Sequence, residues 1–376
     1  MKFSVARIQR FMAQEQADGL LLAGNSNLLY ALGEIPNGYL YIPAKGEPIL
    51  FARRPVKTDV ETVLIRKPED IPNLLSDKPK CVALEENDLT FSEYSRLAAL
   101  FPETLPRGTA ILRLARSVKS AEEITVMRRT SQKHGEIYQQ IPALYQKGMT
   151  DTEFAVAIES LLLSSGHLGL FRTHGTHMEA FMGTILAGPN ADAPSPFDFA
   201  LGGQGAHPSL PVGGDNVLLA GDMTVMADFS ANFEGYLSDL SRTYSIGTLP
   251  DIAYKAHNLS LTIQEALANA GKPGAVCGDL YQLSLDMVQE AGLSAHFMGC
   301  TKQSGFVGHG LGLEINELPV LFRKNRVSLE ENMVIALEPK FVFPEFGAVG
   351  TENTYIVTKT GMEKITICPE EIVKLA

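Results

Sequence analysis

Short apolar runs alternate with stretches of helical spacing in the first third of the chain. The runs are rich in branched and aromatic residues and end at turn-forming residues, which predicts strands at 19–24, at 38–51 (two strands around a Lys-Gly turn), at 62–66 and at 81–86. The segment 88–102 has helical spacing, with Asp88 as its expected cap. This alternation predicts a small α/β domain over residues 1–116.

Longer helices begin after this point. Ser120 followed by Glu123 is a capping box, which predicts a helix through residue 141. A second helix is expected from an acidic cap at Asp151 to a stop at Gly166. The Gly- and Pro-rich stretch that follows, 187–216, is long enough to indicate a functional loop. We therefore expect a second domain over residues 117–376.

The second domain contains a faint internal repeat. Leu219–Asp228 and Leu329–Glu338 align without gaps as L-x-x-[DN]-M-x-[VI]-x-x-[DE]. Each copy predicts an apolar strand that ends on a carboxylate. After a turn, each is followed by a second strand with another acid near its start, Asp239 in one copy and Glu352 in the other. Two related halves that face each other are the simplest interpretation.

The four acids of the repeat would repel one another strongly if they converged without cations. Two divalent ions would balance the four negative charges of Asp228, Asp239, Glu338 and Glu352. His309, which lies between glycines in "VGHGLG", is the candidate for a neutral ligand that completes the site. Oxygen-rich ligation with one nitrogen favours Mn²⁺, Fe²⁺, Co²⁺ or Zn²⁺. The pattern therefore predicts a dinuclear metal site.

Composition narrows the classes of function. Hydrophobic residues make up 45% and charged residues 20% of the 376-residue chain, as in an ordinary globular protein. A net charge of −11 argues against nucleic acid and anionic membranes as partners. The four cysteines form no CxxC pair, and the N-terminal segment lacks a signal-peptide pattern, so we expect a cytoplasmic protein without a disulfide framework.

Four motifs resemble those of the metal-dependent "pita-bread" peptidases, in particular the branch of Xaa-Pro dipeptidase (prolidase) and aminopeptidase P. They are "DFSANFEGYLSDLSRTYSIG", "GHGLGLEINELP", "ALEPKF" and "GTENTYIVT". The eleven-residue spacing of the two aspartates and the order Asp, Asp, His, Glu, Glu are similar to the family pattern. The resemblance implies an α/β (α+β) chain with a small mixed-sheet domain like the N-terminal domain of creatinase and prolidase. A pita-bread domain would follow, with a curved antiparallel sheet and outer helices.

The resemblance also implies roles for individual residues. Asp228 would chelate one metal, Asp239 and Glu352 would bridge both, and His309 and Glu338 would bind the other. Glu338 would act as general base, and a hydroxide bridging the two ions would be the nucleophile. Mn²⁺ is the preferred ion, with Co²⁺, Fe²⁺ and Zn²⁺ as alternatives.

Two positions depart from the family pattern. Asn316 stands where the resembled peptidases carry a histidine that contacts the substrate, and an amide cannot shuttle a proton. The family histidine that precedes the first aspartate has its nearest counterpart in His207, which we expect close to the substrate. We interpret His174 and His177 as loop or wall residues, and Arg172 and Arg323 are candidates for recognising a substrate C-terminus.

The leading hypothesis is a metallo-exopeptidase, an Xaa-Pro dipeptidase or aminopeptidase, that acts on small peptides with proline after the scissile bond. The alternative is a hydrolase or lyase of the same fold that acts on a non-peptide small molecule, and the asparagine at 316 motivates it. A non-enzymatic binding module would have lost the metal ligands, which this chain retains. No membrane or nucleic-acid partner is expected, and the resemblance implies a homodimer.

Overall fold

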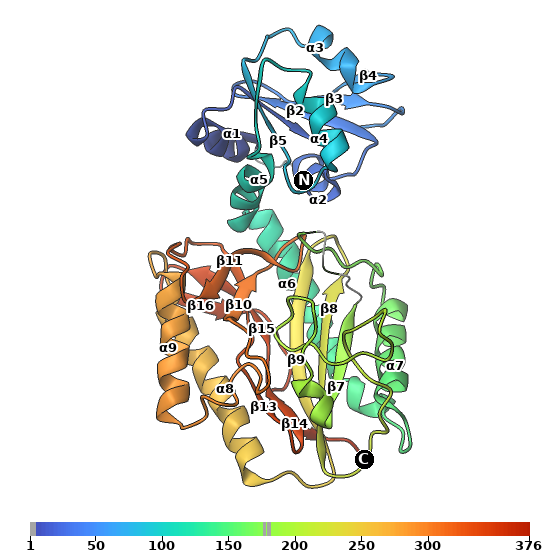
Figure 1. Ribbon diagram of the computed structural model, residues 1–376, viewed down its shortest axis with the longest axis vertical. Coiled ribbons are helices and arrows are strands. Elements are labelled where there is room, and N and C mark those ends of the chain that lie inside the picture. Colours follow the sequence, from blue (N-terminus) through green and yellow to red (C-terminus); the bar gives the residue numbers. More distant parts are fainter. Residues whose placement is uncertain (1–4, 176–177, 179–181) are drawn as a thin grey trace. The chain divides into compact units, whose positions relative to one another are not determined.

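The computed structural model describes residues 5–175, 178 and 182–376, so His177 lies outside the described residues. The chain divides into two compact units, Met1–Arg116 and Ser117–Ala376 (Figure 1). Each unit has its own sheet and its own hydrophobic core.

The smaller unit is built on a six-stranded mixed sheet in the order β4-β3-β2-β1-β5-β6. The strands are β1 Gly19–Leu22, β2 Gly38–Pro43, β3 Ile49–Ala52, β4 Glu61–Leu64, β5 Cys81–Leu84 and β6 Glu103–Leu105. β2 pairs antiparallel with both β1 and β3, whereas β1–β5, β3–β4 and β5–β6 are parallel. The apolar runs of the sequence thus form the sheet that the alternation predicts.

Helices of the smaller unit are α1 Val5–Gln14, α2 Asn25–Leu32, α3 Ile71–Leu74, α4 Phe91–Ala98 and α5 Gly108–Ser117. The expected cap of α4 was wrong. Thr90 is the cap, and its side chain accepts a hydrogen bond from the backbone N–H of Glu93. Asp88 instead accepts a hydrogen bond from the Thr109 hydroxyl at 2.8 Å. The carboxylate that was expected to cap α4 therefore binds a residue of α5.

The described residues of the larger unit form two mainly antiparallel sheets and a separate two-stranded hairpin. One sheet has the order β11-β10-β12-β15-β16, the second has the order β17-β9-β8-β7, and β13 pairs with β14. The short β17 pairs parallel with β9, and the other pairings are antiparallel. The bounds are β7 Gly183–Ala187, β8 Met223–Asn232, β9 Leu237–Ile246, β10 Phe306–Gly310, β11 Glu317–Phe322, β12 Val334–Leu337, β13 Lys340–Phe343, β14 Gly347–Gly350, β15 Asn353–Thr358, β16 Gly361–Lys364 and β17 Val373–Lys374.

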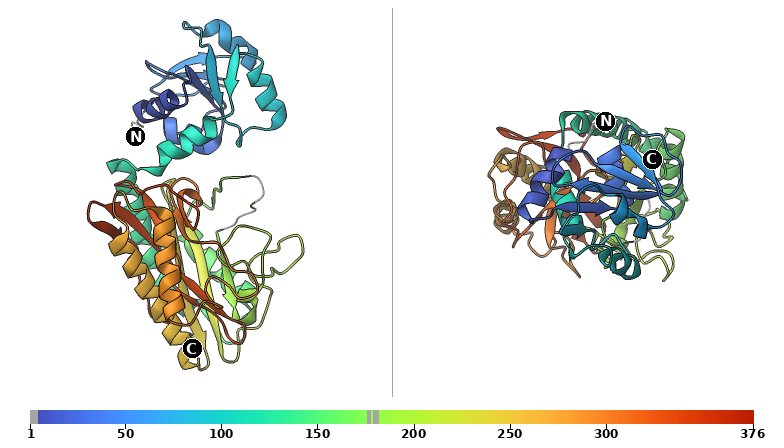
Figure 2. Two further views of the ribbon diagram at one scale, coloured as in Figure 1. Left: turned by 60° about the vertical axis from the view of Figure 1, so that its left-hand side comes forward. Right: turned by 90° about the horizontal axis from the view of Figure 1, so that it is seen from above.

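In the described part of the larger unit, four α-helices cover the outside of these strands. They are α6 Ala121–Tyr138, α7 Asp151–Ser164, α8 Asp251–Ala270 and α9 Cys277–Glu290. α6 and α7 pack against β7 and β9, while α8 and α9 lie side by side against the other strands (Figure 1; Figure 2, left). In the part of the chain that the structure describes, no helix has the length and apolar character needed to span a membrane.

Two capping predictions had different outcomes. The capping box of α6 is confirmed, because Ser120 accepts from the backbone N–H of Glu123 and Glu123 accepts from that of Ser120. The cap of α7 is Thr150, which forms a capping box with Glu153, so the prediction of Asp151 was wrong by one residue. Asp151 accepts a hydrogen bond from the backbone N–H of Asp215 at 3.0 Å. This bond fixes the later part of the long connection between β7 and β8, residues 188–222.

Candidate metal centre

The β8–β9 hairpin places the two aspartates on one face. Asp228 pairs with Ser241, and Ser230 pairs with Asp239. Side chains directly opposite each other, or two positions along, point to the same side of a sheet. Asp228 and Asp239 are therefore diagonal neighbours, which explains their eleven-residue spacing. Asp228 lies in the middle of β8 and not at its end, contrary to the expectation from the repeat.

The other half of the unit supplies the remaining side chains. His309 lies on β10 opposite Ala336 of β12, and Glu338 directly follows β12. Glu352 directly precedes β15, and its backbone N–H donates to the carbonyl of Ser241 at 3.2 Å. This bridge joins the two strand groups, so acids that are far apart in sequence meet where the halves of the repeat meet.

Asp239, His309 and Glu352 form the first of two ligand clusters. His309 Nε2 lies 3.7 Å from Asp239 Oδ2, 3.9 Å from Glu352 Oε1 and 3.4 Å from Glu338 Oε1. Nitrogen and oxygen ligands about 2.1 Å from a shared ion in tetrahedral geometry are about 3.4 Å apart, close to these separations.

Two observations fit a divalent ion in this first cluster. Glu352 Oε1 is buried and has no hydrogen-bond partner among the described residues, although a buried carboxylate oxygen normally has one. His309 Nδ1 lies 3.1 Å from the carbonyl of Gly310, which can only accept a hydrogen bond. In the neutral imidazole the proton is therefore on Nδ1, and the Nε2 lone pair faces the carboxylates.

Lys340 lies in the second cluster, formed by Asp228, Glu338 and Glu352. Its Nζ donates to Asp228 Oδ2 at 2.8 Å, to Glu338 Oε2 at 2.7 Å and to Glu352 Oε2 at 3.2 Å. The lysine side chain is fully buried, as are those of the two glutamates. The hydroxyl of Ser241 also donates to Glu352 Oε2, at 2.7 Å. The second cluster thus already contains a cation.

Burial and charge act in opposite directions on these groups. Burial, with repulsion from Glu352, Asp228 and Glu338, raises the pKa of Asp239 well above its ordinary value. Burial also raises the pKa of Asp228, although the Lys340 ammonium opposes that shift. Burial would lower the pKa of Lys340, but attraction to three carboxylates outweighs it and holds this pKa well above the ordinary value. The ammonium stays charged, and no described residue places a comparable cation on the Asp239 side of the site.

Lys340 and Ser241 belong to the site but are not among the residues predicted from the sequence. Lys340 follows Glu338 by two positions in "ALEPKF", and residues i and i+2 of an extended segment share a face. The available signal in the sequence was a lysine at the start of the apolar run Lys340–Phe343, because such a run is usually buried and a lysine rarely is unless it has a partner. Ser241 was recognisable as the residue two positions after Asp239, on the same face of β9.

Asn316 uses its side-chain amide to hold a neighbouring segment. Its Oδ1 accepts from the backbone N–H of His174 at 2.6 Å, and its Nδ2 donates to the carbonyl of His174 at 3.0 Å. The backbone N–H of Ile315 donates to the carbonyl of Arg172 at 2.9 Å. Residues 172–174 are therefore fixed to the loop that follows His309, and a catalytic role for Asn316 stays a prediction.

His207 lies on the exposed surface of the 188–222 connection. Its Nδ1 is 2.7 Å from the Ser209 hydroxyl, and its carbonyl accepts from the backbone N–H of Leu210. These contacts close a local turn. The proximity of His207 to a substrate stays a prediction.

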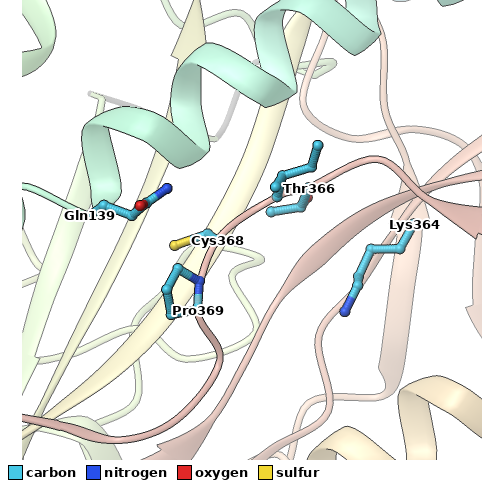
Figure 3. Close-up of a pocket in the computed structure, with 6 residues that line it drawn as sticks. Gln139, Lys364, Thr366, Cys368 and Pro369 are labelled. Carbon is cyan, nitrogen blue, oxygen red and sulfur yellow. The ribbon is translucent and has the colours of Figure 1, made fainter.

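A separate hollow lies between the C-terminal end of α6 and the segment 364–369 (Figure 3). Gln139, Lys364, Thr366, Cys368 and Pro369 line it, together with Ile367. Arg242 donates to the carbonyls of Cys368 and Pro369 and so holds this segment against β9. The hollow contains none of the clustered acids, so the carboxylate–histidine clusters are the better candidate for chemistry.

Two sheets that meet at a cluster of carboxylates and a histidine are typical of a metal-dependent hydrolase. The model of "Metallopeptidase family M24" matches residues 125–359, and that of "Creatinase/Prolidase N-terminal domain" matches residues 5–118. The chain belongs to metallopeptidase family M24. The expected combination of a mixed-sheet N-terminal domain and a pita-bread domain is confirmed, and the family implies divalent metal ions.

Two curated relatives illustrate matches over nearly the full chain. An uncharacterized peptidase of Bacillus subtilis is 25% identical over 98% of this chain and 99% of its own length. The Xaa-Pro dipeptidase of Pyrococcus horikoshii is 24% identical, with 99% of each chain covered. Among solved structures, an Xaa-Pro dipeptidase from Bacillus anthracis has a TM-score of 0.81 at 22% identity, covering 99% of each chain. An X-Pro aminopeptidase from Thermotoga maritima has a TM-score of 0.78 at 22% identity, covering 98% of this chain and 99% of its own.

Proposed function

We propose that this protein is a metal-dependent exopeptidase that hydrolyses the peptide bond before a proline residue. The observation that carries the proposal is the cluster of Asp239, His309 and Glu352, in which the buried Glu352 Oε1 has no hydrogen-bond partner among the residues that the structure describes. Family membership and the Xaa-Pro dipeptidase among the full-length relatives support the substrate class. Mn²⁺ is the preferred ion because the ligands are mostly carboxylates.

Glu338 is the residue that we assign as general base. Its Oε2 accepts from Lys340, whereas its Oε1 faces His309 Nε2 at 3.4 Å. The ammonium holds the carboxylate in one orientation, and the second oxygen remains in position to accept a proton from the attacking water. A divalent ion held by Asp239, His309 and Glu352 would supply Lewis acidity to the scissile carbonyl and acidify a water.

The test is hydrolysis of Xaa-Pro dipeptides in Mn²⁺ by wild type and Glu338→Gln. We expect Glu338→Gln to fold and to lose roughly 10²–10⁴-fold in turnover, the usual contribution of a general base. Glu345→Gln, an exposed glutamate in the β13–β14 turn, is the matched control and should keep wild-type turnover. Equal turnover in Glu338→Gln and wild type would contradict the assigned role.

One observation favours a second candidate, a reaction on a non-peptide small molecule. Asn316 engages the backbone of His174 and carries no charge, so its contribution to a peptidase transition state is limited to hydrogen bonding. A panel of Xaa-Pro peptides that gives no turnover in Mn²⁺ or Co²⁺, beside turnover of a small amide, would favour this candidate. The resemblance also predicts a homodimer, which light scattering at micromolar concentration tests.

A further inference from the structure

Glu338 and Glu352 each direct their two oxygens toward different partners. Glu338 Oε2 and Glu352 Oε2 accept from Lys340 Nζ, at 2.7 and 3.2 Å. Glu338 Oε1 and Glu352 Oε1 instead face His309 Nε2, at 3.4 and 3.9 Å. Each carboxylate therefore lies between two positions suited to a cation, one at Lys340 Nζ and one on the His309 side. Here one of the two cation positions is held by an ammonium.

The geometry of Lys340 matches that of a bound cation. An ammonium has three N–H donors, and three carboxylate oxygens lie within 3.2 Å of Nζ. The acceptors come from Asp228, Glu338 and Glu352, which are the three members of the second ligand cluster. A divalent ion bound by those residues would lie about 2.1 Å from their oxygens and would overlap the space of the nitrogen.

We infer that Lys340 is a built-in cation that replaces one of two metal ions, so that the site binds a single divalent ion at Asp239, His309 and Glu352. The inference rests on the proposed function only for the presence of a metal. Lys340 is fully buried, so it acts as a positioning residue that holds Glu338 and Glu352. Four ionised carboxylates, one ammonium and one divalent ion sum to −1, and a second divalent ion would place excess positive charge beside Nζ.

The two aspartates provide a matched pair for testing this asymmetry. Asp239 belongs to the cluster in which no described residue supplies a cation, and Asp228 belongs to the cluster that contains Lys340. Asp239→Asn should weaken Mn²⁺ binding by about 100-fold or more, because it removes a ligand. Asp228→Asn should weaken it by no more than about tenfold, the lower end of the range for residues outside the ligand shell. Equal losses for the two variants would overturn the inference, because a dinuclear site needs both aspartates as ligands.

The decisive experiment counts ions in the full-length protein. Wild type, Lys340→Ala and the control Lys364→Ala, whose ammonium pairs with Glu370 at the surface, are dialysed against Mn²⁺ and analysed for metal content and by electron paramagnetic resonance. We expect one isolated ion per chain in wild type and in Lys364→Ala, and two exchange-coupled ions in Lys340→Ala. Two ions in wild type, none in wild type, or only one in Lys340→Ala would each overturn the inference.

Xaa-Pro hydrolysis measured on the same samples separates this inference from the proposed function. One bound ion without hydrolysis would refute the peptidase and leave the single-ion site intact. Two bound ions with hydrolysis would do the reverse. If Lys340→Ala does not fold, the number of Mn²⁺ ions bound by wild type and the Mn²⁺ affinities of the two aspartate variants still test the inference. Anomalous scattering from Mn²⁺-soaked wild-type crystals should then give one peak, between Asp239, His309 and Glu352.

Discussion

A buried ion pair in the larger unit allows a quantitative test of the structure. Lys119 Nζ lies 3.1 Å from Glu317 Oε2, and the two side chains are 1% and 2% exposed. Glu317 Oε1 also accepts from the backbone N–H groups of Leu313 and Glu314, at 3.0 and 3.4 Å. The pair therefore fixes the loop that connects His309 to Asn316, on which the candidate site depends.

Lys119→Met keeps an apolar stem of similar length and removes the ammonium. Breaking one partner of a buried pair costs about 3–5 kcal/mol, because the other charge remains buried. We expect Lys119→Met to lower the free energy of unfolding by about 3 kcal/mol, the lower end of this range, because the two backbone N–H groups still bind the Glu317 carboxylate. At a urea dependence of about 3 kcal/mol per molar, the unfolding midpoint of the larger unit should fall by about 1 M.

The assay is urea denaturation followed by circular dichroism, with hydrogen exchange of β8–β9 peptides to identify the transition of the larger unit. Glu317→Gln in the Lys119→Met background should recover more than half of the loss, because an amide oxygen can accept the same backbone hydrogen bonds without a buried charge. Lys359→Met, at an exposed position, should change the stability by less than about 0.5 kcal/mol. A loss below about 1 kcal/mol in Lys119→Met, or no recovery in the double variant, would refute the reasoning.

Three further predictions concern the substrate and the smaller unit. Arg172 is half-buried, and its backbone carbonyl accepts from the N–H of Ile315, next to Asn316. Arg172→Met should therefore raise KM for Xaa-Pro dipeptides by roughly 10–100-fold but not KM for their C-terminal amides, whereas Arg323→Met, at an exposed position, should change neither. Asn316→His removes the amide that holds the 172–174 segment, so Xaa-Pro turnover should fall or stay unchanged; a rise of about tenfold or more would indicate a non-peptide substrate. Burial raises the pKa of Glu85 to about 7, so the folded smaller unit binds a proton that the unfolded chain releases near 4.5, and its stability should fall by about 3 kcal/mol as pH rises from 4.5 through 7. Urea denaturation of the full chain at pH 5 and pH 8, with hydrogen exchange of β1 peptides as the probe, measures the change, and Glu85→Gln should flatten it.

Local patterns in the sequence predicted the elements but not all of their ends. The apolar runs of the smaller unit became strands, and the Ser120 capping box opened a helix as expected. Asp88 and Asp151 were wrong as caps because each has a partner distant in sequence, the Thr109 hydroxyl and the Asp215 backbone. A carboxylate near the start of a helix is a good local candidate for a cap, but tertiary hydrogen bonds decide which neighbouring residue forms the cap.

The repeat predicted where acids would gather because strand pairing carries their positions across the sheet. The β8–β9 hairpin pairs Asp228 with Ser241 and Ser230 with Asp239. Two aspartates eleven residues apart therefore become diagonal neighbours on one face of the sheet. The same pattern placed Asp228 at the end of a strand, and it lies in the middle of β8. The error arose because the ten-residue β8 continues past Asp228 through a segment of alternating apolar and polar residues, which pairs with β9.

The prediction of two divalent ions was based on the four carboxylates alone and did not include the positive charge of Lys340. Four carboxylates call for two divalent ions only if no other cation reaches them, and Lys340 reaches three of the four. Its position follows from geometry that the sequence contains, since Lys340 is two residues after Glu338 and shares its face. The Coulomb attraction among such closely packed buried groups is large enough to keep the ammonium charged despite its burial, as the raised pKa of Lys340 indicates. Glu352 Oε1, which has no hydrogen-bond partner in the described part of the chain, then marks the side of the cluster where the remaining negative charge lies, and this is the side that contains His309.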